Sequence, residues 1–220
     1  MPADQAAGLR RRSALQPLRR IDCFFDTPAS TSRLAHALHR RGWTSLLVDT
    51  RGRVLADSPT RSLFDWRQQL ARGQLHTLPM PFGDGWHAPG MQGDEPALRT
   101  LAQGYDCLLL DAGPDASEWT PLPGASHALV LEVDASQASM LQGYSLLKTL
   151  SHHGGHTRVG LLGDAGACAR VQAACREFLD PLFCRGLYSV AGEGDAFAAL
   201  AVRMAAEETG LTARYKTGNT

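Results

Sequence analysis

Short apolar runs alternate with segments of helical periodicity along most of the chain. Apolar runs of strand length occupy residues 21–25, 43–48, 75–78, 107–110, 128–133, 158–162 and 187–190. Helical spacing, capping-type residues and terminal glycines predict helices between them, at about 34–41, 62–72, 95–103, 137–150, 165–179 and 196–208. Strands that are apolar throughout must be covered on both faces. The pattern therefore predicts a mostly parallel, doubly wound α/β sheet with helices on both sides.

The length and composition are those of one globular domain with additional terminal segments. The chain has 220 residues, of which 44% are hydrophobic and 20% charged. We divide it into an N-terminal arm (1–20), an α/β domain (21–208) and a polar tail (209–220), and we expect residues 79–93, rich in proline and glycine, to form a long loop. No apolar run approaches the roughly 18 residues of a membrane span. Because no secretory signal precedes the five cysteines, we expect reduced thiols in a soluble, cytoplasmic protein.

The formal charge of the chain is zero, but it is unevenly distributed. Residues 1–20 contain five arginines and one aspartate, so this segment carries +4 and the remainder −4. Such a basic arm is a candidate contact element for an acidic protein surface, a phosphate group or a lipid headgroup. A contact with DNA or a transcription factor would rest on these arginines alone, and we expect no direct nucleic-acid binding; DNA binding would weaken steeply with salt.

Polar residues follow three of the predicted strands, at the edge of the sheet where ligands bind in doubly wound folds. One of these polar segments follows the first strand. The other two begin at the aspartates that end the apolar runs Leu-Leu-Val-Asp (Asp49) and Leu-Leu-Leu-Asp (Asp111). This order of elements resembles the MinD/ParA branch of P-loop ATPases over about residues 20–205. The resemblance implies that Asp49 is the first acid of the D-x-D segment and that Asp111 is the Walker B-type aspartate that handles magnesium. It implies further that Ser30 and Thr31 are remnants of the nucleotide site.

The turn after the first strand lacks the parts of a phosphate-binding loop. In the MinD/ParA family this turn is rich in glycine and carries two lysines, whereas residues 26–31 read D-T-P-A-S-T and the two lysines of the chain are Lys148 and Lys216. Pro28 removes one of the backbone donors that a phosphate would need, and Arg51 stands at the second acid of the D-x-D segment. Each lost donor typically costs a factor of about 10² to 10³ in turnover. We therefore expect that the protein does not hydrolyse ATP at a useful rate, that it binds ATP weakly or not at all, and that it has no catalytic residues of its own.

Residues 4–10 read D-Q-A-A-G-L-R, and their composition favours a short amphipathic helix. Asp4 is a good N-cap, and Ala6 and Leu9 form a small apolar stripe. Gly8 weakens such a helix by about 1 kcal/mol relative to alanine. The segment is therefore expected to fold mainly on a partner.

The same segment matches the D-Q-A-x-x-L-R motif that opens FlhG (FleN, YlxH), the MinD-like family that regulates flagellar number and placement. In that family the N-terminal helix stimulates FlhF, a GTPase of the signal-recognition-particle type. The resemblance implies that Ala6 and Leu9 dock in an apolar groove, that Arg10 pairs with an acid or phosphate, and that Gln5 helps to position the attacking water. It makes an FlhF-like GTPase the first partner to expect, with flagellar basal-body or regulatory proteins as further ones.

One alternative from another class stays open beside this interpretation: a live MinD/ParA-type ATPase that binds ATP and magnesium at an unusual loop and dimerises on ATP. Whether a homodimer forms without nucleotide is also open. We otherwise expect no cofactor and no metal site, because adjacent histidines such as His152, His153 and His156, without a nearby acid or cysteine, are more typical of a surface loop than of a zinc site. The alanine-rich segment 195–208 favours a core helix over a basic membrane anchor, so we expect weak or no membrane binding.

Overall fold

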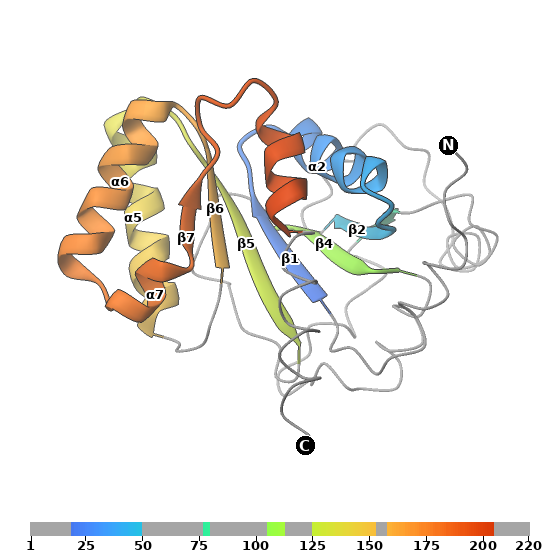
Figure 1. Cartoon of the computed structure of the whole chain (residues 1–220), viewed down its shortest axis with the longest axis horizontal. Helices are drawn as coiled ribbons and strands as arrows, with labels where there is room; N and C mark the ends of the chain where they lie inside the picture. Colours follow the sequence, from blue (N-terminus) through green and yellow to red (C-terminus); the bar gives the residue numbers. More distant parts are fainter. Residues whose placement is uncertain (1–18, 50–76, 80–104, 113–124, 153–157, 205–220) are drawn as a thin grey trace, which may run out of the picture.

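The computed structural model describes residues 19–49, 77–79, 105–112, 125–152 and 158–204. In this part of the chain seven strands form one sheet, in the order β3-β2-β4-β1-β5-β6-β7, and every neighbouring pair is parallel (Figure 1). The strands are β1 (Arg19–Phe24), β2 (Ser45–Asp49), β3 (Thr77–Pro79), β4 (Cys107–Asp111), β5 (Ser126–Val133), β6 (Arg158–Gly163) and β7 (Leu187–Ser189). The predicted doubly wound parallel α/β fold is confirmed.

Helices cover both faces of this sheet (Figure 1). They are α2 (Pro28–Arg40), α5 (Gln137–His152), α6 (Ala165–Phe178) and α7 (Pro181–Arg185), followed by a helical segment at 196–204. One buried cluster joins α2 and the segment 196–204 to the sheet through Leu34, Leu38 and Leu200, and a second joins α5 and α6 through Leu147 and Val171. Alternate residues of β1 supply the two clusters, because side chains of a strand point to opposite faces.

Local signals explain where these helices begin and end. Proline at the first position and an aspartate cap start α7, where Asp180 Oδ1 accepts a hydrogen bond of 2.6 Å from Leu182 N–H. Asp164 caps α6 in the same way, at 2.7 Å from Ala167 N–H. The chain turns after α2 at Gly42, whose φ of +80° favours glycine. The described residues contain no helix that is both long and apolar enough to cross a bilayer.

Several boundaries differ from the sequence prediction, and two of them bear on the site. Arg19 and Arg20, which we assigned to the basic arm, belong to β1, where Arg20 is buried and pairs with Asp22 at 2.8 Å. Helix α2 begins at Pro28 rather than near Leu34, so residues 28–31 form its first turn. The expected helices at 62–72 and 95–103, the expected loop at 79–93, the arm up to residue 18 and the tail lie outside the described residues.

Candidate functional site

The sheet changes the direction of its connections between β1 and β5. From β1 the chain passes through α2 to β2 on one side, and from β5 it passes through α5 to β6 on the other. In doubly wound sheets, ligands bind at the carboxyl ends of the strands where the connections diverge. A cleft of about 210 Å³ lies at this place. It is lined by Phe24, Asp26, Leu131, Glu132, Asp134, Ser136, Ala138, Ser139, Gln142, Gly143 and Leu146.

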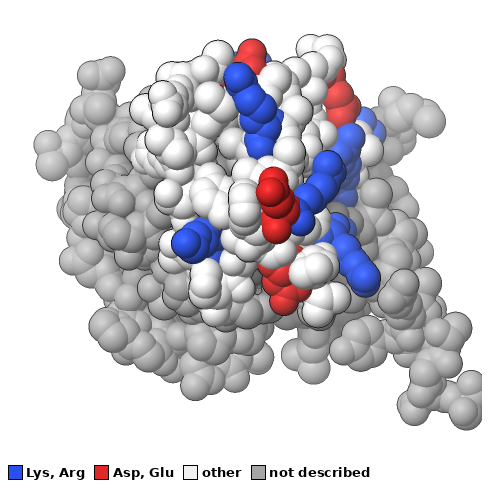
Figure 2. Space-filling view, turned by 90° about the vertical axis from the view of Figure 1, so that its left-hand side faces the viewer, with Lys and Arg blue, Asp and Glu red and all other residues white. Residues whose placement is uncertain are grey.

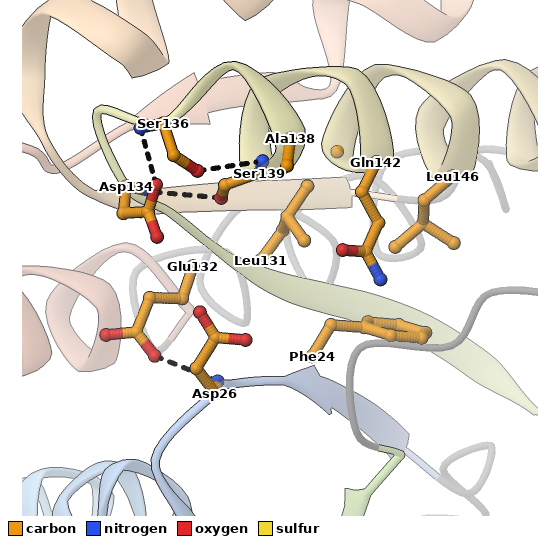
Figure 3. A pocket seen from close by; sticks show the side chains of 11 residues that line it. Phe24, Asp26, Leu131, Glu132, Asp134, Ser136, Ala138, Ser139, Gln142 and Leu146 are labelled. Carbon is orange, nitrogen blue, oxygen red and sulfur yellow. Dashed lines mark hydrogen bonds between the residues drawn. The ribbon is translucent and has the colours of Figure 1, made fainter.

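The cleft has an acidic end and an apolar end (Figure 3). The carboxylates of Asp26, Glu132 and Asp134 gather at one end, whereas Phe24 and Leu146 lie at the other. Among the residues that the structure describes, the lining of the cleft includes three acids and no lysine, arginine or histidine. The arrangement therefore favours a group that is positively charged at one end and apolar along its stem, and disfavours an anion.

The turn between β1 and α2 spans only residues 25–27. Thr27 occupies the N-cap of α2 without a side-chain hydrogen bond, Pro28 has no N–H, and Ser30 N–H donates to Thr27 O at 3.0 Å. The Glu132 carboxylate accepts a hydrogen bond from Asp26 N–H at 3.2 Å (Figure 3). An anion is favoured at a helix N-terminus. Here the carboxylate of the chain's own β5 already occupies that position.

The environment of Glu132 opposes its negative charge. Burial raises the pKa of Glu132 above the ordinary 4.5, and the charge of Asp26 raises it further. The hydrogen bonds from Asp26 and Thr27 and the positive charge of Arg33 lower it without cancelling the rise. The Glu132 carboxylate thus binds the turn although burial disfavours its charged form.

This raised pKa predicts a pH dependence of stability. The folded protein binds the Glu132 proton more tightly than the unfolded chain, so the free energy of unfolding should fall as pH rises from 4.5 through the raised pKa. Replacing Glu132 with glutamine should remove this fall, because the amide oxygen still accepts a backbone N–H but does not ionise. Urea unfolding between pH 4 and pH 7, followed by circular dichroism, measures the effect.

Glu177→Gln on the exposed face of α6 is the matched control and should leave the profile unchanged. Asp134 and Asp195 affect stability in a lower pH range. The hydrogen bonds that their carboxylates accept from Ser136 and from Ala198 lower the pKa of these carboxyls below 3.8. Their contribution is lost as pH falls below that value. If Glu132→Gln kept the wild-type slope above pH 4.5, the assignment to Glu132 would be wrong.

The structure brings together two of the four predicted nucleotide-site remnants. Thr31 Oγ1, in the first turn of α2, lies 3.2 Å from Asp111 Oδ1 at the end of β4, and both side chains are fully buried. Ser30 is also buried, in the first turn of α2. Asp49 ends β2, which is separated from β1 by β4, and it is buried as well. All four therefore lie near the carboxyl edge of the sheet, but inside the protein rather than on the wall of the cleft.

Sequence reasoning missed the residues that follow β5. Asp134 Oδ1 accepts a hydrogen bond of 2.6 Å from Ser136 N–H, Ser136 Oγ accepts one from Ser139 N–H at 3.1 Å, and Ser139 Oγ accepts one from Asp134 N–H at 3.0 Å (Figure 3). This network closes the N-terminus of α5 on itself. A serine directly before the helix (Ser136) and another three residues later in its first turn (Ser139) were the signal that could have identified this cap.

The remaining candidate ligands do not assemble into a site within the described residues. No group of three or more histidine, cysteine, aspartate or glutamate residues in this part of the chain is placed to hold a metal ion. All five cysteines are free thiols, and burial raises the pKa of Cys107 and of Cys175 to about 12. His152 Nδ1 lies 2.6 Å from Lys148 O, whereas His153 and His156 lie outside the described residues.

The outer surface beside α6 and α7 carries charges of both signs. Figure 2 shows lysine and arginine side chains interspersed with aspartate and glutamate on the described part of this face. A face that binds nucleic acid concentrates basic side chains. This view therefore adds nothing to the basic arm as support for DNA binding.

The predicted partner-binding residues Asp4, Gln5, Ala6, Leu9 and Arg10 lie outside the described part of the chain. Their proposed roles consequently rest on the sequence motif. Comparison with known protein families and with curated proteins finds no match for this chain.

Proposed function

We propose that the protein is an FlhG-like regulator of flagellar number and placement, which stimulates a GTPase of the signal-recognition-particle type through its N-terminal helix. The observation that carries the proposal is the motif D-Q-A-A-G-L-R at residues 4–10, placed shortly before the first strand of a doubly wound parallel sheet. A regulator that acts through a short helix needs only a few well-placed groups. Phosphoryl transfer is catalysed mainly by positioning and by electrostatic stabilisation, so such groups suffice.

We propose further that the α/β domain does not work as an ATPase, and the β1–α2 turn supports this. One of its backbone donors, the N–H of Asp26, already binds the Glu132 carboxylate, and Pro28 contributes none. A triphosphate at this turn would meet three carboxylates and would have to displace one of them. The domain then serves as a scaffold that carries the helix.

A synthetic peptide of residues 1–20 should raise the GTP turnover of an FlhF-type GTPase. Replacing Gln5 with alanine in the peptide should reduce this stimulation by about 10²-fold, because a group that positions the attacking water is lost. Multiple-turnover phosphate release measures both peptides.

Gly8→Ala is the matched control, since it improves helix propensity by about 1 kcal/mol without touching a motif position. It should stimulate at least as well as the natural peptide. A natural peptide that leaves GTP turnover unchanged would contradict the proposed function.

One contact favours a second candidate, a live MinD/ParA-type ATPase. In P-loop enzymes a serine or threonine of the loop and a strand-end aspartate together hold magnesium. Thr31 Oγ1 and Asp111 Oδ1 form such a pair at 3.2 Å. Calorimetric titration of the full chain with ATP and magnesium separates the two candidates. Micromolar binding supports the ATPase, and binding weaker than millimolar supports the scaffold.

A further inference from the structure

The cleft between β1 and α5 selects against anions and for a cationic side chain with an apolar stem. Its three carboxylates lie at one end, and the N–H groups nearest to them are engaged by Glu132 and by the Asp134–Ser136–Ser139 network. None of the described residues that line the cleft is basic, and the one positive charge that acts on Glu132 from outside this lining is that of Arg33. An arginine fits such a surface because its methylene stem packs on apolar side chains while the guanidinium pairs with carboxylates.

The chain itself contains a segment of this chemistry. Within residues 1–18, Leu9 is followed directly by Arg10, Arg11 and Arg12, and Asp4 is the one acid. The covalent tether gives such a segment a high effective concentration at a nearby surface, and opposite charge favours the contact. The arm and the acidic end of the cleft are therefore complementary in charge and in apolar character.

The geometry of β1 allows the arm to reach the cleft. The arm joins the sheet at Arg19, at the amino end of β1, and the cleft lies at the carboxyl end of this strand of six residues, about 20 Å away. Residues 13–18 span about 20 Å when extended, so they bring the three arginines level with the cleft. Phe24, which lines the cleft, belongs to the buried cluster of α5, so the cleft opens on that face of β1.

We propose that the N-terminal arm of the chain docks in this cleft, with Arg10, Arg11 and Arg12 at the carboxylates. The inference rests on the proposed function, because it is the activating helix that is held. Docking sequesters this helix until the GTPase competes for it. The site is thus an autoinhibitory contact whose ligand is a segment of the same chain.

Limited trypsin digestion of the full chain tests the contact, since trypsin cuts after the three arginines. In the wild type these bonds should be protected at 0.05 M salt. The double substitution Asp26→Asn and Asp134→Asn should increase their cleavage rate about fivefold to tenfold, because proteolysis follows the population of the free arm. Asparagine keeps the side-chain oxygen that Ser136 N–H needs, and a far-UV spectrum checks that the variant folds.

Two controls keep the result interpretable. Glu177→Gln removes an exposed charge on α6, outside the cleft, and should leave the rate unchanged. Raising the salt to 0.5 M should speed cleavage in the wild type by screening, after correction with a free peptide of residues 1–18. Equal cleavage of wild type and double variant would overturn the proposal, and so would a wild-type rate equal to that of the free peptide.

A photo-crosslinker in place of Leu9 identifies the occupant. A crosslink to α5 at the mass of one chain supports docking within the chain. A crosslink at the mass of two chains shows that a second copy supplies the arm, and the absence of any crosslink shows that the cleft does not hold it. Either of these results overturns the proposal. If the peptide of residues 1–20 still stimulates the GTPase, the proposed function survives that failure.

Discussion

Replacing Gly163 with alanine should destabilise the protein by more than about 3 kcal/mol. Gly163 ends β6 with φ at +112°, a conformation that L side chains rarely adopt. A methyl group there would lie 2.2 Å from the carbonyl oxygen of Val133, which is backbone of the paired strand β5. The same carbonyl accepts a hydrogen bond from Asp164 N–H at 2.9 Å, so neither strand can move away without losing the start of α6. Urea unfolding measures the change.

Two other glycines separate the causes of this loss. Gly42 has φ at +80° but open space around it, so Gly42→Ala should cost only the backbone strain of about 1–2 kcal/mol. Gly194 has neither positive φ nor a close neighbour, and Gly194→Ala should change stability by less than about 1 kcal/mol. A Gly163→Ala variant no less stable than Gly42→Ala would show that the close approach of β5 and β6 can relax.

Removing the carboxylate of Asp22 should cost about 3–5 kcal/mol, because it leaves a buried guanidinium without its partner. Asp22 Oδ1 accepts a hydrogen bond from Arg20 Nε at 2.8 Å and forms an ion pair with Arg20 Nη2 at 2.8 Å; the side chain of Asp22 is 0% exposed and that of Arg20 is 7% exposed. His127 Nδ1 lies 3.9 Å from the other carboxylate oxygen. The group lies on the paired strands β1 and β5 in the interior of the sheet. Chemical denaturation of Asp22→Ala gives the loss directly.

An exposed ion pair supplies the control. Arg203 and Glu193 are as close, at 2.7 Å, but both side chains are 42% exposed, so Glu193→Ala should cost about 1 kcal/mol or less. The double variant Arg20→Met with Asp22→Leu should recover much of the loss, since an apolar pair of similar size often replaces a buried ion pair without penalty. A loss below about 1 kcal/mol for Asp22→Ala would mean that solvent reaches Arg20.

The order of the elements could be read from the sequence because each strand is apolar by itself. The runs in β2, β4 and β6 need cover on both faces wherever they lie, and this requirement implies the alternating helices. The start of β1 could not be read in this way. Arg19 and Arg20 look like part of a basic arm until Asp22, two residues later on the same face, supplies the buried partner of Arg20. Helix α7 has five residues and shows no periodicity, although Asp180 and Pro181 mark its start.

Some features of the candidate site could likewise be read from the sequence, and others could not. The sequence by itself determined that Thr31 and Asp111 end up at the carboxyl edge of a parallel sheet, because both follow apolar strands, and that the β1–α2 turn lacks glycine and lysine. It also determined the arm motif, which consists of neighbouring residues. Only the tertiary structure decided what the turn binds, since the Glu132 carboxylate comes from 106 residues away and the Thr31–Asp111 contact joins residues 80 apart. Such contacts depend on which strands become neighbours, and neither composition nor local periodicity specifies that order.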